Sequence, residues 1–270
     1  MMRRQMKKKM EITITVLAIA FSLSGCATTG DDKILPQPII QKAQFLRVGI
    51  TPTAPPLIFK QGIRTVGLEA DLARALAQEL GKTVRFIELG WNDLIPALLG
   101  NRIDIIMSGM TITKAREVRI AFTEPYLRAG QMALVLRENY HRYPSLSSIK
   151  MSSSRVGMVK GTTGEFFVQQ EFLLARKISF STPEEGVQSL VEGRLDLFVH
   201  DAPVIWWMAS EREAEGLTPL SFLLTQEKLA WGIRKEDREL LQSVNLFLEA
   251  WNTDGRLHKA TEYWIPLADD

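Results

Sequence analysis

The feature of this 270-residue chain that most constrains its fold is an alternation of short apolar strands with amphipathic helices. Leucines recur every four residues from Leu68 to Leu80 and Gly81 follows, which is the pattern of a helix with a glycine C-cap. The apolar run 103–107 is interrupted only by Asp104, as in a parallel strand covered on both faces. This order predicts an α/β domain. Strands are expected at 46–50, 84–88 and 103–107, and helices at 69–80 and 91–99.

The same alternation starts again in the second half of the chain. Two apolar extended segments, 132–136 and 229–233, lie between the two units and are expected to cross from one unit to the other and back. A helix at 236–251 and another after Gly255 end the chain. In the second unit, strands are expected at 155–159, 178–180 and 195–199, and helices at 164–174, 183–192 and 202–212.

Two α/β units connected by two strands predict two Rossmann-like lobes with a hinge, and a cleft that closes on a ligand. We expect residues 45–132 with 229–270 to form lobe 1, and residues 133–228 to form lobe 2. The polar, proline-containing run 26–44 is expected to be a flexible tether.

The first 25 residues have the pattern of an export signal. Five basic residues precede an apolar stretch at about 12–23, which is shorter than the roughly 20 residues of a spanning helix. Leu23-Ser-Gly-Cys26 ends this stretch and resembles the bacterial lipobox, in which the cysteine receives fatty acyl chains such as palmitate and becomes the mature N-terminus. We therefore expect a lipoprotein signal peptide at 1–25, and a membrane anchor on Cys26 in the periplasm or at the cell surface. A plain secretory signal with an incidental cysteine is the alternative.

Charge and cysteine content exclude several classes of function. The chain has 33 basic and 31 acidic residues, of which five and one lie in residues 1–25, so the remainder has 28 and 30 and a net charge of −2. The basic excess thus belongs to the signal, and no nucleic-acid partner is expected. Cys26 is the only cysteine, which rules out an intramolecular disulfide. Because the three histidines are scattered, we expect no metal site and no cofactor.

Segment 108–116 has features of an anion site. It follows a buried strand and opens a helix, which is where ligands collect in α/β sheets. Arg116 stands in the first turn, where a cation opposes the helix dipole, so an anionic ligand would supply its partner. An ion pair with Glu117 or Glu124 is the alternative.

Two features of the second unit could also face a ligand. The loop 161–164 offers the hydroxyl and N–H groups of Thr162 and Thr163 to an anion, or it serves only as a turn. Asp201 follows an apolar strand and precedes a helix, so it is either a helix N-cap or a ligand contact.

Together these segments resemble the amino-acid-binding branch of the bacterial periplasmic solute-binding proteins, family 3. The run from Gly109 to Arg116, Gly-Met-Thr-Ile-Thr-x-x-Arg, is its most specific part. The resemblance covers roughly 46–263. It implies a type II periplasmic binding protein fold, and a monomeric, non-enzymatic receptor that hands an amino acid to the permease of an ABC importer. The other segments that carry it are Gly67-Leu-Glu-Ala-Asp71, Trp91-Asn-Asp-Leu-Ile-Pro-Ala-Leu98, Ala121-Phe-Thr-Glu-Pro-Tyr126, Gly161-Thr-Thr163 and 193–201.

The resemblance also implies residue roles. Arg116 would pair with the ligand α-carboxylate from lobe 1, and Asp201 with the α-ammonium from lobe 2. The Thr111 hydroxyl and the backbone near Gly109 would bond both ligand groups, and the Thr163 N–H would reach the carboxylate. Further ligand-binding candidates are Ser108, Thr162, Thr51 and, as a stacking wall, Trp91.

Departures from the family pattern bear on the ligand. Members commonly carry an acid where this chain has Thr51, and an aromatic residue where it has Ala54 or Leu57. A cationic ligand side chain therefore loses a partner, unless Glu69 or Glu165 replaces it. We expect a neutral or polar amino acid. Trp206 and Trp207 are interpreted as packing residues.

Two other functions stay open. Cyclohexadienyl dehydratases resemble this family and act on prephenate or arogenate. Such an enzyme would need a general acid in the closed cavity, for which Glu165 is the second-lobe candidate. A ligand-sensing receptor would instead need a separate signalling partner.

Overall fold

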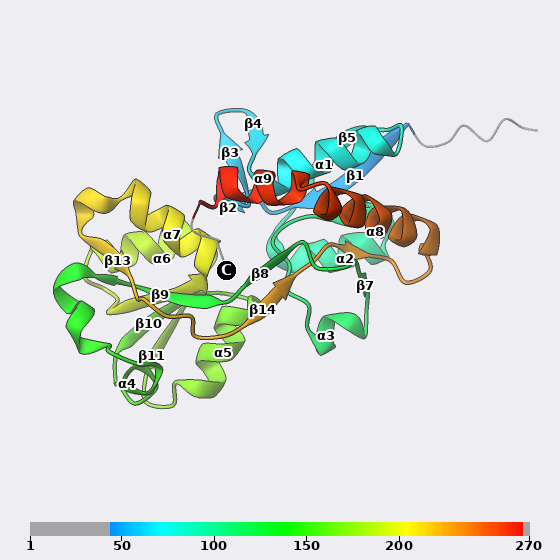
Figure 1. Cartoon of the computed structure of the whole chain (residues 1–270). Coiled ribbons are helices and arrows are strands. Elements are labelled where there is room, and N and C mark those ends of the chain that lie inside the picture. Colours follow the sequence, from blue (N-terminus) through cyan, green and yellow to red (C-terminus); the bar gives the residue numbers. More distant parts are fainter. Residues whose placement is uncertain (1–43, 267–270) are drawn as a thin grey trace, which may run out of the picture. The chain divides into compact units, whose positions relative to one another are not determined.

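The computed structural model describes residues 44–266. The predicted signal peptide, Cys26 and the tether up to residue 43 lie outside the described residues. The first of two five-stranded sheets has the order β5-β1-β6-β15-β7 (Figure 1). Strands β5 (Thr83–Glu88) and β6 (Ile105–Ile106) pair in parallel with β1 (Phe45–Ile50). Strand β15 (Gly232–Ile233) runs antiparallel to β6 and to β7 (Ala121–Phe122).

The second sheet repeats this arrangement in the order β11-β10-β12-β9-β13. Strands β10 (Arg155–Val159), β11 (Arg176–Phe180) and β12 (Leu197–Asp201) are parallel. Strand β9 (Gln131–Leu136) runs antiparallel to β12 and to β13 (Leu217–Pro219). Each sheet is the centre of one lobe.

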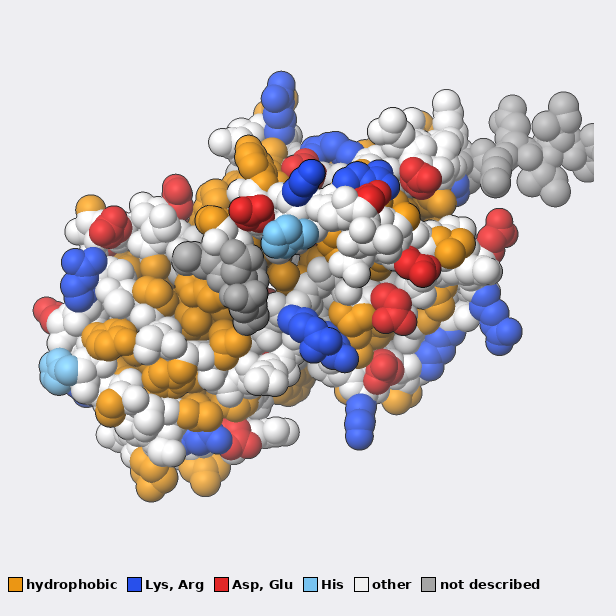
Figure 2. Space-filling view, in the orientation of Figure 1, with side chains coloured by type: hydrophobic (Ala, Val, Ile, Leu, Met, Phe, Trp, Pro, Cys, Tyr) orange, Lys and Arg blue, Asp and Glu red, His pale blue; other side chains and the backbone are white. Residues whose placement is uncertain are grey.

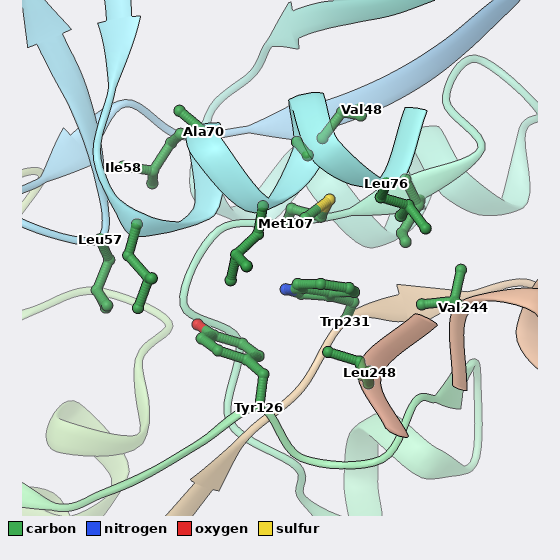
Figure 3. Packing of buried hydrophobic residues seen from close by; sticks show 14 of the residues in the cluster. Val48, Leu57, Ile58, Ala70, Leu76, Met107, Tyr126, Trp231, Val244 and Leu248 are labelled. Atoms are coloured by element: carbon green, nitrogen blue, oxygen red, sulfur yellow. The ribbon is translucent and has the colours of Figure 1, made fainter. Parts of the chain in front are cut away.

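Lobe 1 is built from helices whose apolar stripes cover its sheet. The leucine stripe of α1 (Leu68–Glu79) is buried, as its spacing predicts. Figure 3 shows the core beneath it, where the ring of Trp231 stacks on that of Tyr126 with centroids 5.4 Å apart. The other helices are α2 (Leu94–Leu99), α3 (Lys114–Glu117), α8 (Arg238–Thr253) and α9 (Arg256–Trp264).

In lobe 2, alternate residues of one strand enter different cores. Met132 and Leu134 of β9 lie in one apolar cluster, whereas Ala133 and Val135 lie in the other. Both faces of this sheet are therefore buried, which explains the continuous apolar runs in its strands. The covering helices are α4 (Leu146–Lys150), α5 (Thr163–Glu171), α6 (Pro183–Val191) and α7 (Ala202–Glu211), with short 3-10 turns at Arg137–Arg142 and Glu213–Glu215.

The strands that connect the lobes differ from those expected. Segment 132–136 belongs to the second sheet, and most of 229–233 leads into the first. The crossing pair is instead β8 (Leu127–Ala129) with β14 (Glu227–Leu229), which run antiparallel between the lobes (Figure 1). The expectation rested on apolar composition, which identifies strands buried inside sheets. The crossing pair instead carries exposed charges at its centre. The boundary expected after residue 132 falls inside β9.

The proline-containing loop expected after residue 50 is partly a small sheet. Its strands are β2 (Thr53–Ala54), β3 (Ile58–Gln61) and β4 (Arg64–Val66). A 3-10 turn, Trp91–Asp93, forms the start of the helix expected at 91–99. Among residues 44–266, no helix combines the length and apolarity needed to span a bilayer. On the face in Figure 2, basic and acidic side chains are interspersed.

Candidate ligand-binding site

A cavity lies between the lobes, where the carboxyl ends of parallel strands from both sheets meet. The nine residues predicted from the sequence to bind a ligand all line it, and ligand contact itself stays a prediction. The sequence reasoning did not place the other lining residues there as ligand contacts: Thr53, Ala54, Leu57, Val159, Ser181, Pro183 and His200.

Arg116 reaches the cavity from lobe 1. Its Nη1 donates to the Thr111 carbonyl oxygen at 2.8 Å and its Nη2 to the Gly161 carbonyl oxygen of lobe 2 at 3.4 Å. The guanidinium lies over the Trp91 ring, 5.3 Å from the centroid. Within the part of the chain that the structure describes, it forms no ion pair, so the two glutamates considered from the sequence do not account for it. This guanidinium is held by neutral partners and remains charged toward the cavity.

Asp201 faces the same cavity from lobe 2. It is the last residue of β12 and the residue before α7, yet its carboxylate does not cap that helix. Its Oδ1 accepts a hydrogen bond from Gln131 Nε2 at 2.5 Å. Burial and the nearby Glu227 raise the pKa of Asp201 to about 7, against the opposing effects of Gln131 and Arg116. A buried carboxylate of this kind is stabilised by a cationic partner.

A second carboxylate, that of Glu227, lies at the start of the crossing strand β14. Its Oε2 accepts from the Thr111 hydroxyl at 2.7 Å and from the Thr163 hydroxyl at 2.8 Å. Its Oε1 accepts from the Thr225 hydroxyl at 2.8 Å. Thr111 belongs to lobe 1 and Thr163 to lobe 2, so this side chain bonds to both. No sequence pattern distinguished Glu227 from a surface acid.

The loop around Gly109 is attached to the core of lobe 1. Gly109, whose φ of 67° suits glycine, donates its N–H to Glu69 Oε2 at 2.5 Å. The Trp231 indole donates to Glu69 Oε1 at 3.2 Å. Glu69 is 0% exposed, and burial raises its pKa to about 8. Glu69 supports the loop from beneath and does not line the cavity, so it cannot serve there as the partner considered for a cationic ligand.

The loop 161–164 has a corresponding attachment in lobe 2. Gly161 donates its N–H to Glu165 Oε2 at 2.7 Å, and Ser179 donates its hydroxyl to Glu165 Oε1 at 2.6 Å. The Thr162 hydroxyl caps α5 by accepting from the Glu165 N–H. A Cβ on Gly161 would lie 2.3 Å from Asn92 Oδ1 of lobe 1. This contact and the φ of 79° both favour glycine here. Glu165 also stays outside the cavity wall.

The rim of lobe 1 contributes hydroxyl groups that are already partly engaged. Ser108 Oγ accepts from the Thr51 N–H at 2.8 Å, and the Thr51 hydroxyl donates to the Leu89 carbonyl oxygen at 3.0 Å. The Trp91 indole donates to the Gly161 carbonyl oxygen at 2.8 Å, which connects the two lobes. Thr51 thus presents an oxygen acceptor to the cavity.

His200 is a cavity residue that the sequence reasoning missed. Its Nδ1 accepts from the Asp201 N–H at 2.8 Å, and burial lowers its pKa to about 4. The imidazole is therefore neutral at pH 7 with its hydrogen on Nε2, so it can donate to a ligand oxygen. The sequence analysis considered the histidines only as metal ligands, and its expected strand 195–199 ended one residue before His200.

The charge of the cavity wall is small. Among the described residues that line it, Arg116 is the only cationic side chain and Asp201 the only carboxylic acid. The rest of the wall is made of hydroxyl, aromatic, imidazole and apolar groups. Within residues 44–266 no cluster of three or more His, Cys, Asp or Glu side chains could hold a metal ion.

The two tryptophans on α7 pack between the lobes. Trp206 lies against the apolar cores of both lobes, and Trp207 contacts Phe59 of β3 with ring centroids 5.3 Å apart. Their interpretation as packing residues is confirmed.

Comparison with known proteins agrees with this geometry. The sequence profile of the bacterial extracellular solute-binding proteins, family 3, matches residues 46–266. The chain belongs to this family. The histidine-binding periplasmic protein of Salmonella typhimurium is 31% identical over 274 residues, covering 96% of this chain and 97% of the relative. The ABC transporter arginine-binding protein 1 of Escherichia coli is 26% identical over 230 residues, covering 83% and 92%.

Solved structures of this family have the same fold. The ancestral amino-acid-binding protein AncCDT-1, a precursor of cyclohexadienyl dehydratase, has a TM-score of 0.77 at 36% identity and covers 82% of this chain and 96% of its own. A binding component from Wolinella succinogenes complexed with lysine has a TM-score of 0.80 at 31% identity, covering 83% and 97%. The family and the two-lobed fold predicted from the sequence are confirmed. The relatives named here are binding proteins.

Proposed function

We propose that this family 3 protein is an extracytoplasmic receptor that binds one free amino acid in the interlobe cavity. The observation that carries the proposal is that Arg116 of lobe 1 and Asp201 of lobe 2 line the same cavity. An α-carboxylate and an α-ammonium lose hydration when they are buried, so each needs an opposite charge. Both charges are met only when the lobes are closed, and a ligand with these contacts favours closure.

We infer that the ligand side chain is neutral and carries a hydrogen-bonding oxygen, as in glutamine or asparagine. Asp201 is the only acid among the described lining residues and is assigned to the ammonium, so a cationic side chain would be buried without a carboxylate. The His200 Nε2–H supplies a donor for a side-chain oxygen, and Ser181 and Thr53 supply hydroxyls. Relatives bound to arginine, lysine and glutamine indicate that the family accommodates both types of side chain.

Delivery to an ABC importer and a lipid anchor complete the proposal. Relatives are named as binding proteins of ABC transporters, and the lipobox-like Leu23-Ser-Gly-Cys26 supports attachment through Cys26. A monomer presenting its closed lobes to a permease fits this role. Labelled palmitate should enter the wild-type protein in cells and not the Cys26→Ala variant.

A binding role fits the cavity better than the dehydratase, because Asp201, the only acid among the described lining residues, is assigned to the ligand ammonium. That activity needs a general acid in the cavity, and Glu165 is instead bonded to Gly161 and Ser179. Incubation with prephenate or arogenate should leave ultraviolet absorbance unchanged.

A thermal-shift screen over the twenty amino acids tests the proposed function. Glutamine or asparagine should raise the melting temperature most, because binding to the folded state alone stabilises it. Calorimetry would then give the affinity. The proposal fails if no amino acid shifts the transition, and the ligand class fails if arginine or lysine binds most tightly.

A further inference from the structure

Among the described residues, Glu227 is the one that accepts hydrogen bonds from hydroxyl groups of both lobes and from Thr225, two residues before it. It lies outside the cavity wall, at the first position of β14. Three threonine hydroxyls converge on its two oxygens at 2.7–2.8 Å, the usual length of an O–H···O hydrogen bond. Two of these threonines, Thr111 and Thr163, line the cavity.

The direction of these hydrogen bonds decides what the cavity can receive. An ionised carboxylate only accepts, so Thr111 and Thr163 must each donate their single hydroxyl hydrogen to Glu227. The Thr163 oxygen also accepts from Gln131 Nε2 at 3.1 Å. The hydroxyl oxygens can then only accept further hydrogen bonds from a ligand. Thr111 has up to two acceptor positions left, and Thr163 has one. These oxygens suit a ligand donor and oppose a ligand carboxylate.

Building on the proposed function, we propose that Glu227 is a positioning residue of the cavity. From the crossing strand it fixes the hydroxyls of Thr111 and Thr163, one from each lobe, as a pair of acceptors for the ligand ammonium. The ammonium is then received by this pair together with Asp201, and the ligand carboxylate is left to Arg116. This differs from the role implied by the family resemblance, in which the Thr111 hydroxyl also bonds the carboxylate.

The electrostatics of the neighbouring groups agree with this arrangement. Burial lowers the pKa of Arg116, and the charges of Asp201 and Glu227 oppose that effect, so both acids attract the guanidinium although neither forms an ion pair with it. The Glu227 charge also helps to raise the pKa of Asp201. Two acids and one base around a single cavity favour a ligand whose cationic group enters between the acids.

The first test uses the unliganded protein and Glu227→Leu, which nearly keeps the side-chain size but removes the charge and both acceptor oxygens, because Thr111 and Thr163 donate to the same oxygen. Hydrogen exchange measured by mass spectrometry should become faster in β8, β14 and the first turn of α5, since the bonds from Glu227 to both lobes are lost. Thr225→Val is the matched control, because it removes a hydroxyl from the same carboxylate without touching the cavity. Exchange in the first turn of α5 that is unchanged in Glu227→Leu would overturn the proposal.

The second test measures selectivity with L-glutamine and its 2-hydroxy analogue, in which a hydroxyl replaces the ammonium. Glu227→Leu frees the hydroxyls of Thr111 and Thr163 to donate, so the preference for L-glutamine over the analogue should fall about tenfold. Thr225→Val should keep the wild-type preference. A structural defect alone would reduce the affinity for both compounds equally, and that result would overturn the proposal. If L-glutamine does not bind the wild-type protein, the ligand class is wrong and the exchange measurement alone decides the role of Glu227.

Discussion

The two lobes use the same device to shape their cavity loops, but in different surroundings. In lobe 1, Gly109 donates its N–H to Glu69, and in lobe 2, Gly161 donates its N–H to Glu165. Both glycines have a positive φ, 67° and 79°. Glu69 is fully buried beneath its loop, whereas Glu165 is half-buried and also accepts from a hydroxyl near the surface. The comparison indicates that the lobe 1 loop is fixed to the buried core, whereas water could replace the carboxylate that holds the lobe 2 loop.

A second pair of contacts shows that the lobes are structural repeats. In lobe 1, Asp104 accepts from the backbone N–H and guanidinium of Arg47, with the ion pair at 2.6 Å. In lobe 2, Asp196 accepts in the same way from Arg155, with the ion pair at 2.8 Å. These contacts are alike on the side of each sheet away from the cavity, so the lobes differ mainly where they face the ligand.

The largest expected effect is a loss of ligand binding on substitution of Arg116, in contrast to the structural arginines Arg47 and Arg155. Arg116→Ala should weaken amino-acid binding about a thousandfold, because two charge-assisted hydrogen bonds to a buried carboxylate are lost. Its unfolding free energy should change by less than about 1 kcal/mol, since its partners in the protein are neutral carbonyls. Calorimetry and urea unfolding measure the two quantities. Arg155→Ala is the control that should lose stability and keep binding, and retained affinity in Arg116→Ala would refute the assignment.

The two loop attachments should differ in their contribution to stability. Glu69→Ala should lower the unfolding free energy by about 3 kcal/mol, because the N–H groups of Gly109 and Trp231 would be buried without partners. Glu165→Ala should cost less than about 1 kcal/mol, because water can replace the carboxylate there. Urea unfolding of both variants tests this difference. Equal losses would mean that burial does not distinguish the two loops.

The charge contributed by lobe 2 should make binding depend on pH. The pKa of Asp201 is about 7 without a ligand, and a bound ammonium favours its ionised form. Binding therefore releases a proton below pH 7, and affinity should fall up to about tenfold per pH unit on acidification and level off above pH 7. Calorimetry between pH 5.5 and 8 measures the slope. Asp201→Asn should bind weakly and show a flat profile, and a steep profile in that variant would assign the proton to another group.

The smallest effect concerns the turn before the repeated aspartates. Asn101 in lobe 1 has a φ of 55°, where lobe 2 has Gly193 with 69°. The Asn101 side chain also accepts from Arg47 at 3.1 Å. Asn101→Gly relieves the backbone but loses that bond, so the unfolding free energy should change by less than about 0.5 kcal/mol. Gly193→Asn should cost about 0.5–1 kcal/mol, unless the new amide bonds to Arg155. Thermal unfolding of both variants compares the two lobes.

The sequence predicted the cavity better than the connections around it. Position after recognisable strands made Arg116 and Asp201 candidates, and the resemblance to family 3 selected them over an ion pair and a helix N-cap. The crossing strands were misplaced because they are three residues long and carry exposed Arg128 and Lys228, so they lack the apolar signal that marks sheet strands. Glu227 could not have been found, since its proposed role depends on the hydroxyls of Thr111 and Thr163, which are far from it in the sequence.

Burial and repetition were also hidden from sequence reasoning. An acid in the first turn of a helix usually lies at the surface and stabilises the helix through its dipole. Nothing in the sequence marks Glu69 as fully buried. The repeat relating Asp104 to Asp196 is carried by a few scattered residues, which is too little similarity to recognise without the two sheets side by side.

The indole of Trp91 and the guanidinium of Arg116 share one acceptor on the opposite lobe, the Gly161 carbonyl oxygen. Parting the lobes must release the indole N–H into water and take the cation off the ring face. Both changes alter tryptophan emission, so the intrinsic fluorescence of Trp91 should report the separation of the lobes. Subtracting the spectrum of Trp91→Phe would isolate that signal and follow opening in real time, with no added dye.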